Sequence, residues 1–457
     1  MFKYKVLAFF IVVVYFFQSL FLPYGGIGAD GLSYFGMASD FPKLKTNLFP
    51  LIYPALLRFF YESLGDYFWA YKVINLLMVV VLLIFSWFRK FYFKETVLLF
   101  TGKSLFFAMN GAVSESLFIF IFYFLLYVVH SFLSEKLKAA SFVFWASLLV
   151  VLMFGVRYSG IFIYMSLVLF GFWLWLERVR VEQLRIYLAF LLLSGLGIFA
   201  YLGFNQMYFG SFTGEHLRGG RGEFQFVYLF RDFLGMTNVV DPFIGIKPAS
   251  NGYLSLMFQV VLMLVDVFLF FKFVKWYRSN KINFKGSFPK LLWIVTIVYT
   301  VGLFVSGLFQ QIEEMNVRML AIANFAFFFS ALVLYFQVQK KDQLVFRISF
   351  FFFLFLTAYN WKDAGSFLDY KSQMVPQLSR FKHKKYLYNN EKSMVTTTVY
   401  EVPIINKEVK YQHTNKQIGE LKQTVIGAIN PQIKWLKYDT VRDKSQVLYT
   451  SQLKLKN

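Results

Sequence analysis

The sequence predicts an all-α polytopic membrane protein with about eleven transmembrane helices, followed by a small C-terminal extramembrane domain with β-structure. Three observations lead to this fold class. The chain of 457 residues is 58% hydrophobic and only 16% charged, whereas a soluble domain carries about a quarter charged residues. Long apolar runs recur through the first three quarters of the chain. Near the C-terminus, segment 394–400 alternates polar and β-branched residues, which is typical of strands.

The apolar runs match, or nearly match, the roughly 17–25 residues that a helix needs to cross a membrane. The first run is expected to remain as a span, because it is too long for a signal peptide and lacks a small-residue cleavage site before Pro23. Two short runs, 96–109 and 141–156, fit helices packed inside a bundle. The predicted spans are 4–23, 68–88, 96–109, 115–133, 141–156, 161–176, 186–205, 254–274, 291–309, 319–336 and 345–361.

Lysine and arginine in the short loops set the orientation, because cytoplasmic loops carry the excess of positive charge. With the N-terminus inside, the cytoplasmic segments hold 19 Lys and Arg, and the loops on the other side hold 9. The sequence therefore predicts a membrane domain over 1–361 with outer loops at 24–67 and 206–253. An odd number of spans places the C-terminal domain, 362–457, on the outer side. A bacterial cytoplasmic membrane is expected, although an enzyme of the endoplasmic reticulum would obey the same rules.

Composition also limits the chemistry. The chain has no cysteine, which excludes disulfides and thiolate metal sites. With only four histidines, no metal site is expected, and no cofactor is indicated. The net charge of +22 does not indicate nucleic-acid binding, because many of the basic residues flank the predicted spans. The surplus of lysine in the tail fits either contact with anionic lipid headgroups or a solvated basic domain, and the solvated domain is favoured.

Charged side chains collect at span boundaries on the predicted outer side. Charges against hydrocarbon are costly and usually face a cavity or a partner. Arginine binds two phosphate oxygens at once through its planar fork, and an acid beside a hydroxyl can act as a general base. These residues therefore predict a site for a phosphate-linked substrate on the outer face. They are Asp30, Asp40, Glu115, Arg157, Arg218, Arg221, Glu313, Glu314 and Arg318.

Most of these residues have a purely structural alternative. Asp30 could cap a helix, and Ser114 could do the same for the span that opens at Glu115. Arg157 and Arg318 could extend to lipid headgroups. Two further charges fall inside predicted spans. Lys103 either faces a cavity and meets an anion or marks a misplaced boundary, and Asp266 is expected to be a buried, hydrogen-bonded acid. Arg218 and Arg221 lie in a glycine-rich loop that could order over substrate.

Four features of the first 330 residues resemble the GT-C superfamily of polytopic glycosyltransferases, the class of protein O-mannosyltransferases and aminoarabinose transferases. They are the acidic segment 30–34 after the first span, the proline-containing segment 50–57, the pair 114–118 and 157–160, and segment 318–320. The resemblance implies a GT-C-like fold in which Asp30 is the catalytic acid, supported by Tyr34, Asp40 and Glu115. Arg157, Arg318 and Lys103 would hold the polyprenyl phosphate of the donor, with Arg218 and Arg221 nearby.

The chain also departs from this family. Many members have Arg-Pro where Tyr158 follows Arg157 here, and Asp40 is the only other acid near Asp30. A second catalytic carboxylate and a divalent metal are therefore not supported by the sequence.

The predicted function is transfer of a sugar, with inversion, from a polyprenyl-phosphate donor to a lipid, glycan or protein acceptor on the outer face. One alternative is a glycan polymerase or ligase of the O-antigen type, which shares this plan. Another is a transporter or flippase of lipid-linked anions, although paired Gly/Pro-interrupted helices are not found in the two halves. A scaffold without catalysis is the third, and the clustered outer charges argue against it.

Overall fold

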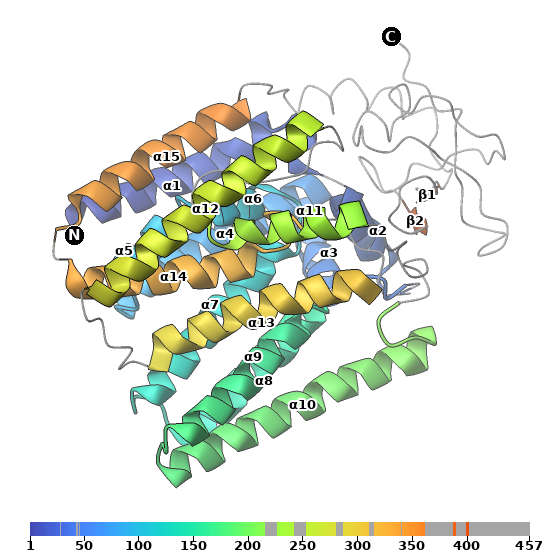
Figure 1. Cartoon of the computed structure of the whole chain (residues 1–457). Helices are drawn as coiled ribbons and strands as arrows, with labels where there is room; N and C mark the ends of the chain where they lie inside the picture. Colours follow the sequence, from blue (N-terminus) through green and yellow to red (C-terminus); the bar gives the residue numbers. More distant parts are fainter. Residues whose placement is uncertain are drawn as a thin grey trace.

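The protein is a bundle of apolar helices (Figure 1). The computed structural model describes residues 1–27, 29–42, 44, 46–214, 226–241, 253–279, 287–309, 315–339, 341–361, 387–389 and 399–401. In these ranges, nine helices are long and apolar enough to cross a membrane. The predicted polytopic helical membrane architecture is therefore confirmed.

The helices follow one another with short connections along most of the chain. In chain order they are α1 Phe2–Phe21, η1 Pro23–Gly26, α2 Ala29–Asp40, α3 Ile52–Leu64, α4 Tyr67–Phe88, α5 Phe93–Leu99, α6 Lys103–Asn110, α7 Glu115–Leu133, α8 Ala139–Val156, α9 Gly160–Leu176, α10 Val181–Phe209, α11 Phe226–Met236, η3 Thr237–Val239, α12 Tyr253–Ser279, α13 Ser287–Phe309, α14 Ala321–Val338 and α15 Gln343–Trp361. Two strands, β1 Leu387–Asn389 and β2 Val399–Glu401, form an antiparallel pair. The rest of 362–457 lies outside the described residues, so the C-terminal domain stays a prediction.

Ten predicted spans coincide with single helices, although α9 has only 17 residues. The predicted span 96–109 is wrong as a single helix. The structure has two short helices there, α5 and α6, interrupted at Phe100–Gly102. Gly102 takes an extended conformation before α6, and the Thr101 hydroxyl donates to the Leu98 carbonyl oxygen at 2.6 Å. Glycine has a low helix propensity, and a threonine hydroxyl competes for backbone partners, so the break has a local cause.

Residues predicted to lie on the cytoplasmic side contact one another in three ion pairs. Lys3 Nζ lies 2.6 Å from Asp342 Oδ1, Lys290 Nζ lies 3.2 Å from Glu177 Oε1, and Arg180 Nη1 lies 3.1 Å from Glu135 Oε1. Each pair joins two different predicted cytoplasmic segments. The helices therefore alternate in direction as the predicted spans require.

A reporter fused after Asn457 is expected to be active outside the cytoplasm. The expectation rests on the charge bias of the loops and on an odd number of crossings, in which α5 and α6 together count as one. At this position, an alkaline phosphatase fusion reports location outside the cytoplasm, and a green fluorescent protein fusion reports location inside it. A fusion after Ser134, in a predicted cytoplasmic loop, is the matched control. Cytoplasmic fluorescence from the C-terminal fusion would mean that one crossing has been miscounted.

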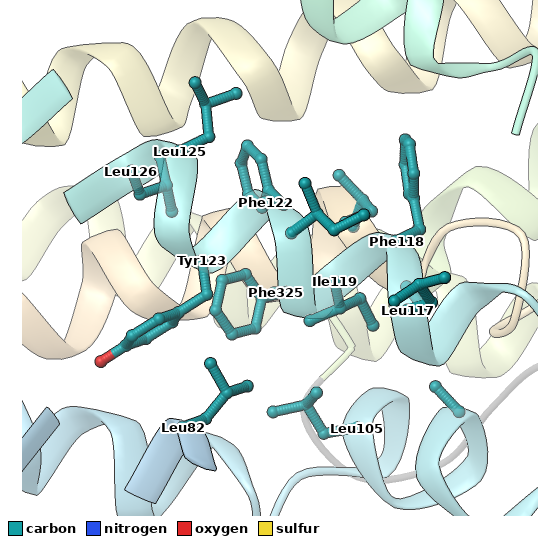
Figure 2. Packing of buried hydrophobic residues seen from close by; sticks show 14 of the residues in the cluster. Leu82, Leu105, Leu117, Phe118, Ile119, Phe122, Tyr123, Leu125, Leu126 and Phe325 are labelled. Atoms are coloured by element: carbon teal, nitrogen blue, oxygen red, sulfur yellow. The ribbon is translucent and has the colours of Figure 1, made fainter. Parts of the chain in front are cut away.

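Helix α7 is the centre of the core. Figure 2 shows Ile119 and Tyr123 on the side of Leu82 of α4, Leu105 of α6 and Phe325 of α14, whereas Phe118, Phe122 and Leu125 point to the opposite side of α7. Most of α7 is buried, whereas α10 and α12 keep wide exposed apolar faces. In Figure 1, α10 lies at one edge of the bundle, packed on α8 and α9, and the pair α1–α15 lies at the other. A central helix with apolar side chains all round is expected to be surrounded by other helices. Glu115, the first residue of α7, therefore lies at the end of a well-packed helix.

Candidate functional site

Helix α2 carries the first acid of the site. Asp30 is the second residue of this helix, so the capping position precedes it and the N-cap alternative does not apply. Gly31 lies against the α6–α7 connection, where an added Cβ would come within 2.9 Å of the Ala112 carbonyl oxygen. This close approach needs glycine. It brings the start of α2 next to the start of α7.

Arg318 reaches this point from a turn that precedes α14. The Asn316 side-chain oxygen accepts hydrogen bonds from the backbone N–H groups of Arg318 (3.0 Å) and Met319 (3.1 Å), which fixes the turn. Arg318 Nη2 lies 2.7 Å from Asp30 Oδ2, and its Nε lies 3.3 Å from Glu115 Oε1. One guanidinium therefore joins two acids from different helices.

Glu115 and Arg157 complete the group. Arg157 follows the last residue of α8, where its backbone N–H bonds to the Met153 carbonyl oxygen. Its Nη1 lies 2.7 Å from Glu115 Oε2 and donates to Ser114 Oγ at 3.1 Å. Ser114 makes no capping hydrogen bond to α7, so the capping alternative for this serine is wrong. Asp30, Glu115, Arg157 and Arg318 are called the outer charge cluster below.

The outer charge cluster is buried on one side, at Glu115, and accessible on the other, which is called its accessible edge. The Glu115 side chain is 5% exposed, whereas those of Arg157, Arg318 and Asp30 are 21%, 29% and 30% exposed. Two acids balance two arginines, so the cluster is neutral by formal charge. Glu115 orients both guanidinium groups, and Asp30 with Arg318 forms the part that a substrate can reach.

Tyr34 is attached to this group through Ser114. Its hydroxyl lies 2.7 Å from Ser114 Oγ, and its ring packs edge-on against Tyr53 of α3 at 4.9 Å between centroids. Tyr53 belongs to the proline-containing segment singled out in the sequence. Burial raises the pKa of Tyr34 well above its usual value. Tyr34 therefore stays a neutral phenol whose hydroxyl contacts Ser114.

Lys103 has a different partner from the one expected. It begins α6, and its Nζ lies 2.7 Å from Asp241 Oδ2, with both side chains buried. Nearby, Asn324 of α14 donates to the backbone carbonyl oxygens of Asn238 (2.9 Å) and Val239 (3.1 Å). Lys103 thus belongs to a second polar network, in which Asp266 is also buried. The phosphate role assigned to Lys103 has no support from these contacts.

Five other predicted site residues have side chains outside the described part of the chain. Arg218 and Arg221 lie outside the described residues, as do Glu313 and Glu314. Asp40 ends α2, but its side chain is also outside the described part.

The described part of the chain contains no group of three or more His, Cys, Asp and Glu side chains that could hold a metal ion. Comparisons with protein-family models, with characterised proteins and with solved structures give no match to this chain.

Sequence reasoning missed the residues that hold Arg318 and Lys103 in place. Asn324 could have been singled out from the sequence, because an amide inside an apolar span needs a buried partner. Asp232, whose Oδ1 accepts from the Met315 backbone N–H, lies in the amphipathic helix α11, which was not among the predicted elements, and Asp241 follows it. Nothing in the sequence alone pairs them with residues of distant helices.

Proposed function

We propose that the protein is a membrane glycosyltransferase of the GT-C type, which transfers a sugar from a polyprenyl-phosphate donor to an acceptor on the outer face. One observation carries the proposal. Asp30 and Arg318, which are 288 positions apart in the chain, meet at 2.7 Å on the accessible edge of the outer charge cluster. A base and a phosphate-binding group are thereby adjacent, as attack on a phosphate-linked sugar requires.

In the proposed reaction, Asp30 and Arg318 have different roles. Asp30 accepts the proton of the acceptor hydroxyl or amine as that oxygen or nitrogen forms a bond to C1 of the sugar. The bond between C1 and the phosphate oxygen breaks, and its electron pair leaves with the polyprenyl phosphate. Arg318 and Arg157 stabilise the charge that develops on this phosphate, an effect that is commonly worth a few kcal/mol. Attack opposite the leaving group gives the inversion that the resemblance implies.

Donor binding is also expected to change the contacts of Asp30, the proposed base. In the donor-free cluster, Asp30 is paired with the Arg318 guanidinium. A donor phosphate competes for the same N–H groups, because guanidinium binds phosphate and carboxylate in the same geometry. When the phosphate takes Arg318, Asp30 loses a partner that holds its negative charge. Donor binding thus makes Asp30 available to the acceptor, and the donor is expected to bind first.

The function is tested with the full chain in proteoliposomes. The vesicles contain a panel of polyprenyl-phosphate hexoses and pentoses, with lipid acceptors, and release of polyprenyl monophosphate is measured. Release that depends on the protein supports glycosyl transfer. Donor binding without release from any member of the panel would contradict it and would favour transport of lipid-linked anions, which a translocation assay in the same vesicles measures.

Arg318→Ala is expected to weaken donor binding by about 10–100-fold, because a hydrogen bond to a charged group contributes about 1.5–3 kcal/mol. Arg157→Ala should have a smaller effect, since this side chain is less exposed and its Nη1 contacts Glu115 and Ser114. Arg318→Lys keeps the charge but loses the planar fork, so an intermediate value is expected. Titration of nanodisc-embedded protein with polyprenyl monophosphate, the lipid-phosphate part of the donor, gives the dissociation constants of the wild type and of the three variants.

Arg58→Ala is the matched control, because Arg58 lies on the predicted outer side and pairs with Glu62 one turn along α3. Its donor affinity should equal that of the wild type. Unchanged affinity in both Arg318→Ala and Arg157→Ala would remove the outer charge cluster from the phosphate site.

A further inference from the structure

The connection between α10 and α12 turns back into the helix bundle. The part of this connection from 226 to 241 comprises α11, η3 and the residues up to Asp241, and is called the re-entrant segment below. In Figure 1, α11 lies across the face of the bundle, where it contacts α12 and α13. Asn238 and Val239 are buried, although they belong to a connection and not to a long helix. Buried irregular backbone needs partners for its polar groups.

Two side chains from other helices supply partners to the end of this segment. Asn324 Nδ2 donates to the carbonyl oxygens of Asn238 and Val239, and Ser104 Oγ donates to Asn324 Oδ1 at 2.7 Å, which sets the orientation of the amide. Lys103 Nζ pairs with Asp241 Oδ2 at 2.7 Å. The end of the re-entrant segment is thereby attached to both α6 and α14.

The middle of the segment contacts the turn that carries Arg318. Asp232 Oδ1 accepts a hydrogen bond from the Met315 backbone N–H at 2.8 Å. Three residues later, Gly235 faces the Met315 carbonyl oxygen, and a Cβ at position 235 would lie only 2.3 Å from it. Both polar groups of the Met315 backbone therefore face α11, at a distance that only glycine allows.

Met315 is directly followed by Asn316, whose side chain caps the backbone of Arg318 and Met319. A shift of Met315 therefore moves the turn and with it the Arg318 guanidinium. This guanidinium contacts Asp30 and Glu115, so its position decides the geometry of the accessible edge. A misplacement of about 1 Å at such a site is costly for catalysis and binding.

We infer that the re-entrant segment is the positioning element of the outer charge cluster, and that Asp232 and Gly235 are the residues that place Arg318 for a phosphate. The inference rests on the proposed function for the identity of the ligand, but not for the geometry. Lys103 and Asn324 have an indirect part in it. They attach the end of the segment to α6 and α14 inside the bundle. This attachment holds Asp232 and Gly235 of α11 in contact with the Met315 backbone.

Gly235→Ala is the first test. The new methyl group must displace the Met315 backbone, and the affinity of the full-length protein for polyprenyl monophosphate in nanodiscs is expected to fall about tenfold, which corresponds to 1.4 kcal/mol. Gly203→Ala on α10 is the matched control, because a Cβ there meets nothing within 4 Å. Its affinity should equal that of the wild type. Wild-type affinity in Gly235→Ala would overturn the inference.

The second test separates the acceptor oxygen of Asp232 from its charge. Asp232→Asn keeps an oxygen that can accept from the Met315 N–H, whereas Asp232→Ala removes it. Asparagine is expected to retain most of the phosphate affinity, and alanine is expected to lose it. Equal affinities in the two variants would contradict the inference. This pair also serves if Gly235→Ala fails to fold.

A double-mutant cycle distinguishes positioning from a general loss of structure. If Gly235 acts through Arg318, adding Gly235→Ala to an Arg318→Ala variant should cause no further loss of phosphate affinity. Additive losses would show that Gly235 acts independently of Arg318, and the inference would be wrong.

A last measurement does not depend on phosphate binding. The chain has no cysteine, so Arg318→Cys introduces a single thiol, whose reaction rate with a membrane-impermeant maleimide reports the position of residue 318. Adding Gly235→Ala is expected to change this rate several-fold, and adding Gly203→Ala is not. An unchanged rate would overturn the positioning role. Failure of the wild type to bind phosphate, with the rate change present, would instead contradict the proposed function.

Discussion

Asp30→Asn is expected to lower the rate of glycosyl transfer by about 10²–10⁴-fold, which is the usual contribution of a general base. The substitution is nearly isosteric and leaves an oxygen that can accept from Arg318. It removes the negative charge that would take the acceptor proton. Because Asp30 competes with the donor phosphate for Arg318, the variant should bind polyprenyl monophosphate at least as tightly as the wild type. The effect is therefore on kcat, measured from initial rates at saturating donor.

Glu62→Gln is the matched control for this experiment. Glu62 is an acid on the predicted outer side, its side chain is 59% exposed, and it pairs only locally with Arg58. Its variant should turn over at the wild-type rate. Wild-type kcat in Asp30→Asn would remove the catalytic role, whereas a loss of donor affinity with unchanged kcat would make Asp30 part of the binding site instead.

The membership of the outer charge cluster could be predicted from sequence for a simple physical reason. Hydropathy fixes where helices end, and the bias of lysine and arginine fixes which ends share a side. Charges at helix ends on one side lie near one plane. Asp30, Glu115, Arg157 and Arg318 were selected in this way, and the structure brings all four into contact.

The lateral arrangement could not be predicted. Hydropathy does not say which helices are neighbours, so the pairing of Arg318 with both Asp30 and Glu115 was not foreseen. The same limit explains Lys103. Lys103 lies inside an apolar run, which suggested an anion, but hydropathy does not indicate that its partner is Asp241 of the connection between α10 and α12. The break at Gly102 was missed because a single glycine is tolerated in many helices.

Lys103→Ala is expected to destabilise the fold by about 3–5 kcal/mol, the usual result of removing one partner of a buried ion pair. The Lys103 side chain is 2% exposed and that of Asp241 is 7% exposed, so water does not replace the lost ammonium group. Asp266 is buried close by and adds a second acid to the same region. The change should appear as a lower thermal midpoint and a lower yield of folded protein in detergent.

Removing both charges separates the ion pair from the packing of the side chains. Lys103→Met combined with Asp241→Asn removes both charges of this pair and leaves no unpaired charge at Asp241, so this double variant is expected to recover much of the lost stability. A Lys103→Ala variant whose thermal midpoint and folded yield equal those of the wild type would contradict the structural role of this ion pair.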